Sequence, residues 1–150
     1  MNAERRLLRG EADTRALAAE LVRRHGPGAV FALHGDLGTG KTRFAQGVAA
    51  ALGVRGLVGS PTFALVLEHP TASGGRFVHM DLYRLADERE AEDLGFGELV
   101  ESAEATVIEW PDVAAGLLPP RTVHVTLAAP DPADPDLRTA LVESGSPPPP

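Results

Sequence analysis

The stretch GDLGTGKT, residues 35–42, decides the fold of this chain. It matches the pattern G-x-x-x-x-G-K-[ST] at every fixed position. Glycines let the backbone bend so that successive N–H groups point into one concavity, which suits a phosphate. Lys41 is the single lysine among 14 basic residues. A compact ammonium on a thin stem can reach between phosphates where the planar fork of arginine cannot replace it. The stretch therefore predicts a phosphate-binding loop.

The flanking residues supply the context that such a loop requires. Residues 28–35, GAVFALHG, form a short apolar run with β-branched and aromatic members, which predicts a buried strand. Residues 42–53 repeat apolar positions at helical spacing through Phe44, Val48 and Leu52. The loop thus joins a strand to a helix, and the positive end of that helix points at the bound anion.

The rest of the chain alternates strand and helix patterns, which predicts an α/β fold with a sheet of mixed direction. One domain is expected over residues 1–143, followed by a disordered or polyproline tail, GSPPPP, at the end of residues 144–150. The remaining expected elements are a helix at 10–26, strands at 58–69 (after a turn at Ser60-Pro61), 76–85, 105–112 and 121–128, two helices within 87–101, and a marginal last strand at 137–144.

Composition limits the classes of function. The net charge is −7, so the whole surface is not a nucleic-acid footprint. The chain has no cysteine, and its five histidines lack metal-ligand spacing, which argues against a thiolate or histidine metal site. No secretory leader and no membrane-length apolar run are present in the sequence, so a cytoplasmic protein without a membrane contact is expected.

Two carboxylates lie where a magnesium ion near the loop would need them. Asp81 follows Val78 and Met80 in alternating phase, and Glu109 follows Val107 and Ile108. A carboxylate at a strand end beside the phosphate loop can bind Mg²⁺ directly or through water. The alternative is an ordinary acid in a solvated turn, and among 21 acidic residues position alone discriminates poorly.

Two further features have both a functional and a structural interpretation. In GSPTF, residues 59–63, Thr62 could sense a γ-phosphate or a metal-bound water, or the segment could be a plain Ser-Pro turn. Trp110 and Tyr83 are the only residues of their types, and both follow a candidate acid closely. They could form a stacking or partner surface, or they could pack in the core.

The motifs GDLGTGKTRFAQG, SPTF, HMDLYRL, LGFGEL and VIEWPD, in this order and spacing, resemble the TsaE (formerly YjeE) family. The resemblance covers about residues 8–143. It implies a P-loop NTPase-like fold, a three-layer α/β sandwich with a central mixed β-sheet. It also implies a small bacterial P-loop ATPase of tRNA threonylcarbamoyladenosine biosynthesis. Such a protein works with TsaB and TsaD, which transfer the threonylcarbamoyl group to an adenosine next to the anticodon. The resemblance further implies ATP and Mg²⁺ as cofactors, tRNA contact only through the complex, and a free monomer.

The resemblance also implies roles for individual residues. Thr42 and Glu109 would hold Mg²⁺, Asp81 would act near the metal and the γ-phosphate, and Ser60 and Thr62 would belong to a switch segment. The nucleotide-contacting residues would be Glu11, Gly38, Thr39, Gly40, Lys41, Thr42, Arg43, Asp81 and Arg138, and the catalytic ones Lys41, Asp81, Glu109 and Thr62.

The chain departs from the family pattern at two of these places. Arg43 stands where the family usually has a second threonine, and its longer cationic side chain could reach a phosphate or alter partner binding in place of a hydroxyl role. The DPADPD loop, residues 131–136, loosens the alignment that gives Arg138 its place.

Three functions are compatible with these residues. The first is an accessory ATPase whose slow hydrolysis a partner completes, since an arginine supplied in trans can add orders of magnitude in rate. The second is a binding module whose nucleotide occupancy gates assembly. The third is a small-molecule kinase, for which 150 residues leave little room for an acceptor pocket and a lid.

Overall fold

The computed structural model describes residues 2–36, 38–56 and 65–145. Its described strands form one seven-stranded sheet in the order β1-β7-β6-β2-β5-β4-β3. The strands are β1 (Asn2–Arg9), β2 (Ala29–His34), β3 (Val66–Pro70), β4 (Arg76–Asp81), β5 (Ala105–Glu109), β6 (Val123–Ala128) and β7 (Leu137–Ser144). The helices are α1 (Gly10–His25), α2 (Lys41–Ala51), α3 (Glu88–Asp93), α4 (Phe96–Ser102) and the 3₁₀ segment η1 (Pro111–Leu117).

The direction of the strands confirms the expected mixed sheet. The central strands β6, β2, β5 and β4 are parallel, whereas β3 on one side and β7 and β1 on the other are antiparallel to their neighbours. Parallel strands place all their carboxyl ends at one edge, and in open α/β sheets that edge is where ligands bind.

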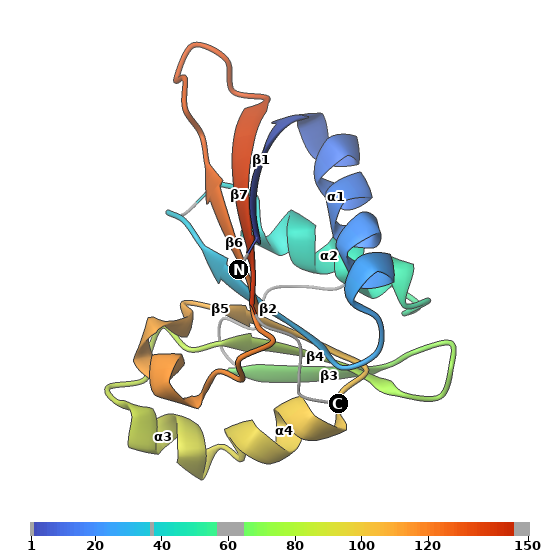
Figure 1. The fold of residues 1–150 in the computed structure, drawn as a ribbon, viewed down its shortest axis with the longest axis vertical. Helices are drawn as coiled ribbons and strands as arrows, with labels where there is room; N and C mark the ends of the chain where they lie inside the picture. Colours follow the sequence, from blue (N-terminus) through green and yellow to red (C-terminus); the bar gives the residue numbers. More distant parts are fainter. Residues whose placement is uncertain (1, 37, 57–64, 146–150) are drawn as a thin grey trace.

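Helices cover both faces of the sheet (Figure 1). Phe31 and Leu33 of β2 point to the face that α1 and α2 cover, and they join that core with Phe44 and Val48 of α2. Val30, the alternate residue of β2, joins a second core with α3, α4 and η1. Because β2 is buried on both faces, its continuous apolar run is explained, and the three-layer α/β sandwich is confirmed.

Two expected strands end earlier than predicted. The strand expected over 76–85 ends at Asp81, because the Asp81 carboxylate accepts a hydrogen bond from the Tyr83 N–H and turns the chain. The strand expected over 105–112 ends at Glu109, since Trp110 has a left-handed backbone (φ 55°). The break within 87–101 is confirmed at Gly95, whose φ of 82° separates α3 from α4.

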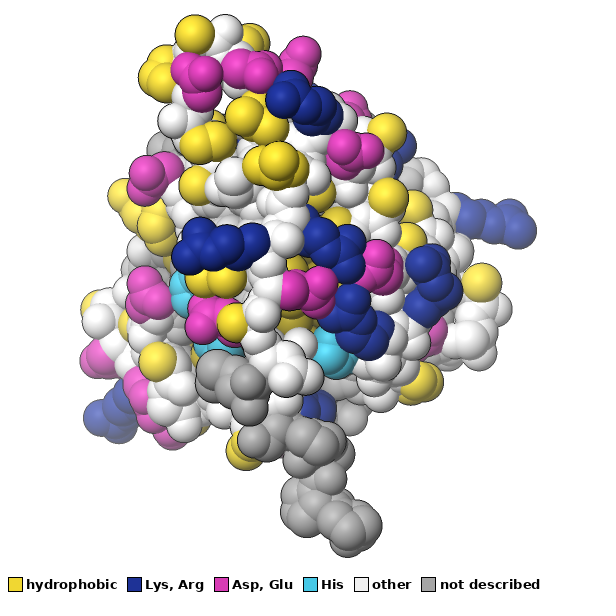
Figure 2. Space-filling model, turned by 45° about the horizontal axis from the view of Figure 1, so that its top comes forward, with side chains coloured by type: hydrophobic (Ala, Val, Ile, Leu, Met, Phe, Trp, Pro, Cys, Tyr) yellow, Lys and Arg dark blue, Asp and Glu magenta, His cyan; other side chains and the backbone are white. Residues whose placement is uncertain are grey.

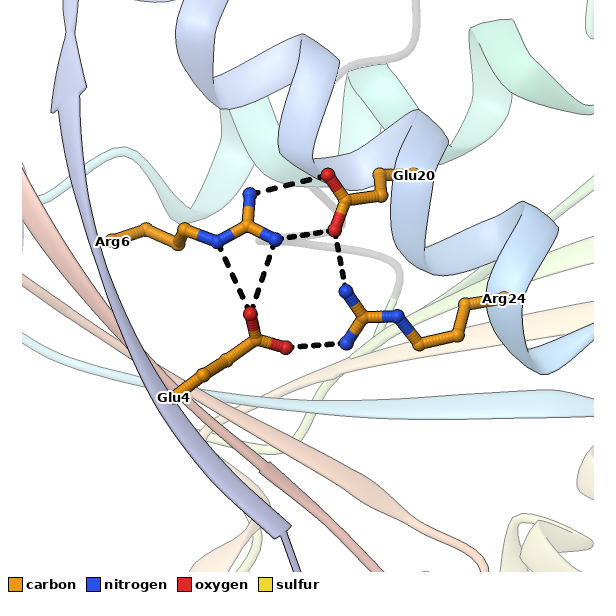
Figure 3. A network of polar contacts seen from close by, with 4 residues as sticks. All are labelled: Glu4, Arg6, Glu20 and Arg24. Atoms are coloured by element: carbon orange, nitrogen blue, oxygen red, sulfur yellow. Dashed lines mark hydrogen bonds and ion pairs between the residues drawn. The ribbon is translucent and has the colours of Figure 1, made fainter.

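The N-terminal strand β1 was not predicted. It pairs with β7 along its whole length, and β7 lies between β1 and β6, so the marginal last strand is an interior strand. Four charged residues, which we call the edge network, join β1 to α1 (Figure 3). Arg6 contacts Glu20 at 2.5 Å and Glu4 at 3.1 Å, while Arg24 contacts both acids. The network holds the sheet edge to the first helix.

Three observations concern the surface, the helices and the C-terminal residues. On the face shown in Figure 2, basic and acidic side chains lie beside one another. Among the described residues, no helix combines the length and the apolar character that crossing a membrane requires. Of the predicted tail, Ser144 belongs to β7, and residues 146–150 lie outside the described ranges.

Candidate nucleotide-binding site

The loop between β2 and α2 is shaped by glycines at two demanding positions. Gly35 has a φ of 138°, and a Cβ added there would lie 2.4 Å from the carbonyl oxygen of Leu127. Gly40, with a φ of 104°, precedes the first residue of α2 in a left-handed conformation. Side chains rarely adopt such backbones, so glycine is required where the loop turns into the helix. The loop therefore presents the N-terminus of an 11-residue helix to the pocket described below.

Lys41, the first residue of α2, is buried, with 5% of its surface exposed, and two contacts hold its side chain in place. Its Nζ donates a hydrogen bond of 2.8 Å to the carbonyl oxygen of Gly35 and lies 3.7 Å from the centre of the Trp110 ring. Burial lowers the pKa of the Lys41 ammonium, and the nearby carboxylates of Glu109 and Asp81 act against that shift. The buried cation thus has one backbone partner and one aromatic face.

Asp81 and Glu109 end neighbouring parallel strands and are direct register partners. Both are buried, at 9% and 4% exposure. Burial raises the pKa of the Asp81 carboxyl, the Tyr83 N–H opposes that shift, and the charge of Glu109 adds to it. The sheet therefore brings the two predicted acids together at the carboxyl edge, beside the loop.

These residues line one pocket of about 680 Å³. It contains nine of the residues expected to contact nucleotide or metal: Glu11, Gly38, Gly40, Lys41, Thr42, Arg43, Asp81, Glu109 and Arg138. Eight more complete the lining: Gly10, Thr14, Leu65, Tyr83, Arg84, Trp110, Pro135 and Asp136. Segments from both ends of the chain and from its middle thus meet at one cavity, whose volume is typical of a small-molecule site.

Among the described residues, one of those expected at the site does not line the pocket. Thr39 is buried but is not part of the lining, because its hydroxyl donates a hydrogen bond of 2.8 Å to the carbonyl oxygen of Asp36. This hydrogen bond stabilises the conformation of the loop itself. Ser60 and Thr62, the expected switch residues, lie outside the described residues.

Two arginines that line the pocket make contacts across large sequence distances. Arg43 of α2 faces Glu11 of α1 at 3.8 Å, so the unusual arginine has an acidic partner at the pocket rim. Arg138 of β7 donates a hydrogen bond of 3.1 Å to the carbonyl oxygen of Gly38. This hydrogen bond links β7, near the end of the chain, to the phosphate loop. Arg138, whose alignment the DPADPD loop loosens, therefore lies at the pocket.

Sequence reasoning missed His79, whose Nε2 lies 2.6 Å from Oε2 of Glu109. We call Lys41, His79, Asp81 and Glu109 the pocket cluster. A signal was present, since His79 precedes Asp81 by two residues on an alternating strand and so shares its face. Trp110, left open between core and surface, lies on Lys41 and packs against Tyr83 with ring centres 5.1 Å apart.

The donors present fit a magnesium ion held together with phosphates. The Thr42 hydroxyl and the carboxylates of Asp81 and Glu109 are hard oxygen donors lining one cavity. Within the described ranges, no cluster of three or more acidic, histidine or cysteine side chains could hold a metal by itself. Magnesium does not need one, because it usually keeps waters and binds one or two protein oxygens plus phosphates.

The fold and the loop define an α/β protein of the P-loop NTPase class. The sequence profile of the threonylcarbamoyl adenosine biosynthesis protein TsaE matches residues 8–135. The chain belongs to the TsaE family.

Individual relatives agree with this assignment. The tRNA threonylcarbamoyladenosine biosynthesis protein TsaE of Bacillus subtilis is 36% identical over 115 residues, which cover 77% of this chain and 71% of the relative. The protein of the same name from Haemophilus influenzae is 40% identical over 95 residues, 63% of this chain and 60% of its own length. The crystal structure of Bacillus subtilis YdiB superposes with a TM-score of 0.77 at 26% identity, over 97% of this chain and 87% of YdiB.

Proposed function

We propose that this protein binds Mg–ATP in the pocket, hydrolyses it slowly alone, and thereby supports threonylcarbamoyl modification of the tRNA adenosine next to the anticodon. The observation that carries the proposal is the meeting of Lys41, Thr42, Asp81 and Glu109 at one cavity beside a helix N-terminus. Family membership supplies the pathway, since the matching profile and relatives are proteins of threonylcarbamoyladenosine biosynthesis.

The phosphate end of the nucleotide would lie on the glycine loop. Backbone N–H groups and the helix dipole attract an anion there. Lys41 would exchange its hydrogen bond to the Gly35 carbonyl for phosphate oxygens, which offer a negative charge that the carbonyl lacks. Glu11 of α1 and Arg138 of β7 also line the pocket, and β6, β2 and β5 separate β7 from β4, the strand of Asp81. These two residues would contact the remainder of the nucleotide.

Thr42 and Glu109 would hold the magnesium ion, and Asp81 would act near it and the γ-phosphate. When bound, Mg²⁺ neutralises charge that develops on the phosphate oxygens. Both carboxylates are buried, so an incoming divalent cation would relieve the cost of keeping two negative charges near each other.

The contacts of two of the three arginines that line the pocket support a low rate of hydrolysis without a partner. Arg43 faces the Glu11 carboxylate, and Arg138 donates to backbone carbonyls. Neither guanidinium is held ready for a transferred phosphoryl group, and an arginine supplied in trans can raise such rates by orders of magnitude. We therefore propose that the TsaB–TsaD pair stimulates hydrolysis.

The experiment is ATP hydrolysis with and without the TsaB–TsaD pair, with Lys41→Ala as the blank. We expect slow hydrolysis by the protein alone, strong stimulation by the pair, and no activity in the Lys41→Ala variant. A Lys41→Ala variant that binds ATP as well as the natural chain would refute the proposed site.

The second candidate is a nucleotide-gated binding module with incidental hydrolysis. Tyr83 favours it, because this aromatic side chain is 69% exposed and lies at the pocket beside Trp110, where a partner could contact both nucleotide and protein. If the pair leaves the hydrolysis rate unchanged while ATP still promotes complex formation, this second function replaces the first.

A further inference from the structure

His79 lies in the middle of β4 and makes one polar contact in the described structure. Its Nε2 lies 2.6 Å from Oε2 of Glu109, with side-chain exposures of 0% and 6%. Its other ring nitrogen, Nδ1, is buried and has no hydrogen-bond partner among the described residues. Leaving a buried ring nitrogen unpaired carries a free-energy cost. The one hydrogen bond that the His79 side chain makes within the described residues, to Glu109, is therefore the contact to explain.

The sheet explains why this contact forms. On β4, His79 and Asp81 point to the same face because they are two residues apart. In the parallel pairing with β5, Val107 is opposite His79 and Glu109 is opposite Asp81. The Glu109 side chain therefore lies between a histidine deeper in the sheet and the pocket that Glu109 itself lines.

The hydrogen-bond pattern assigns the proton to Nε2. A carboxylate accepts only, so the nitrogen that contacts it must donate. With the proton on Nε2, the unpaired Nδ1 is an acceptor without a donor, whereas a doubly protonated ring would bury a second N–H without an acceptor.

We propose that His79 is a positioning residue that donates its Nε2–H to Glu109 Oε2 and fixes the carboxylate for magnesium. The hydrogen bond leaves the other carboxylate oxygen to the metal. Supporting hydrogen bonds of this kind commonly orient metal-binding carboxylates. The inference rests on the function proposed above, in which Glu109 binds Mg²⁺.

The test compares His79→Leu with His79→Gln. Leucine removes the donor at similar size, whereas the terminal amide nitrogen of glutamine can occupy the position of Nε2 and donate. Magnesium is titrated into each protein with ATP bound, and the fluorescence of Trp110, the chain's single tryptophan, reports binding in the pocket. ATP affinity is also measured in EDTA.

We expect His79→Leu to raise the half-saturating Mg²⁺ concentration by about 10- to 100-fold, with ATP affinity in EDTA unchanged. His79→Gln should recover most of the loss. His69→Leu is the matched control, because His69 also stacks on Phe77 and has a buried, unpaired Nε2, yet its described contacts do not include Glu109. This control should leave the magnesium titration unaltered.

Two results would overturn the inference: an unchanged magnesium titration in His79→Leu, or the same fold-loss from His79→Leu in a Glu109→Ala background. If the natural chain shows no magnesium-dependent ATP binding, the proposed function fails instead. Should His79→Leu not fold, ¹⁵N spectra of the metal-free natural protein decide. A His79 ring protonated at Nε2 is expected, and a ring protonated at Nδ1 alone would refute the donor assignment.

Discussion

The edge network and the pocket cluster each contain four charged or ionisable residues, but folding affects their pKa values in opposite ways. In the edge network, each carboxylate contacts a guanidinium (Figure 3). The hydrogen bond from Arg24 lowers the pKa of Glu4, and the hydrogen bond from Arg6 lowers that of Glu20. The same bond raises the pKa of Arg6. Folding therefore favours the charged form of all three groups.

The pocket cluster shows the reverse. Burial lowers the pKa of Lys41 and raises that of Asp81, so folding disfavours the charged form of both. Lys41 is bonded to a backbone carbonyl rather than to a carboxylate, and the two acids face each other across a strand pair. The fold alone therefore works against the charges of Lys41 and Asp81.

The two groups differ in where their charged side chains find partners. The edge network is complete within the chain and stabilises the attachment of β1 to α1. In the proposed function, phosphate and Mg²⁺ supply the charge partners that the described fold does not give to the pocket cluster. Functional sites commonly break the rules of charge pairing that the rest of a fold obeys.

The largest expected effect is on ligand binding through Lys41. Lys41→Met removes the ammonium while a side chain of similar length remains against Trp110. We expect ATP affinity to fall by about 100-fold or more, because a charge-assisted contact to phosphate is lost. The Tm of the ligand-free protein should stay within about 2 °C, since the change also removes a buried charge. Isothermal titration and thermal unfolding measure the two quantities.

Lys41→Arg is the matched control for charge without shape. It should bind ATP nearly as poorly as Lys41→Met, because the guanidinium does not fit the glycine loop. If Lys41→Arg retains natural affinity, charge alone matters and the argument from the single lysine is wrong.

The second prediction breaks the edge network. Arg6→Ala removes one of the two arginines that contact both acids. We expect the Tm to fall by about 2 °C, a small value because these side chains are a third exposed and solvent screens them. ATP affinity should not change. Arg5→Ala is the control, because Arg5 is an exposed residue of the same strand and does not belong to the edge network. A loss of ATP affinity in Arg6→Ala would show that the two groups are coupled.

The sequence predicted the pocket better than it predicted the sheet edges. The loop and the acids at residues 81 and 109 follow rules of local pattern, because parallel strands end at a common edge. Thr39 shows the limit of that approach, since a position inside a motif does not specify whether a side chain faces the ligand or the loop.

Local pattern alone could not give β1 or the contact between His79 and Glu109, for physical reasons. β1 has one buried residue, Leu8, and becomes a strand because β7 offers it partners at least 128 residues away in the chain (Arg9 pairs with Leu137, and 137 − 9 = 128). The role of His79 depends on the register between β4 and β5, which a single sequence does not state. Contacts between distant segments decide both features.

The smallest expected effect is a pair of opposite pH dependences. The pKa of Asp81 is raised by folding, so its contribution to stability is fully present below the pKa of an unfolded aspartate, about 3.9, and is lost as pH rises through the folded value. Asp81→Asn keeps the acceptor for the Tyr83 N–H and removes this loss. At pH 7 the ligand-free variant should therefore be more stable than the natural chain, and the difference should vanish near pH 3.

Glu20→Gln should behave in the opposite way. The folded pKa of Glu20 is lowered, so its contribution is present above the unfolded pKa, about 4.3, and is lost as pH falls through the folded value. The variant should be less stable than the natural chain at pH 7 and should approach it in acid. Urea unfolding at pH 3, 5 and 7 measures both differences. If Asp81→Asn and Glu20→Gln shift stability in the same direction at pH 7, the distinction between the edge network and the pocket cluster does not hold.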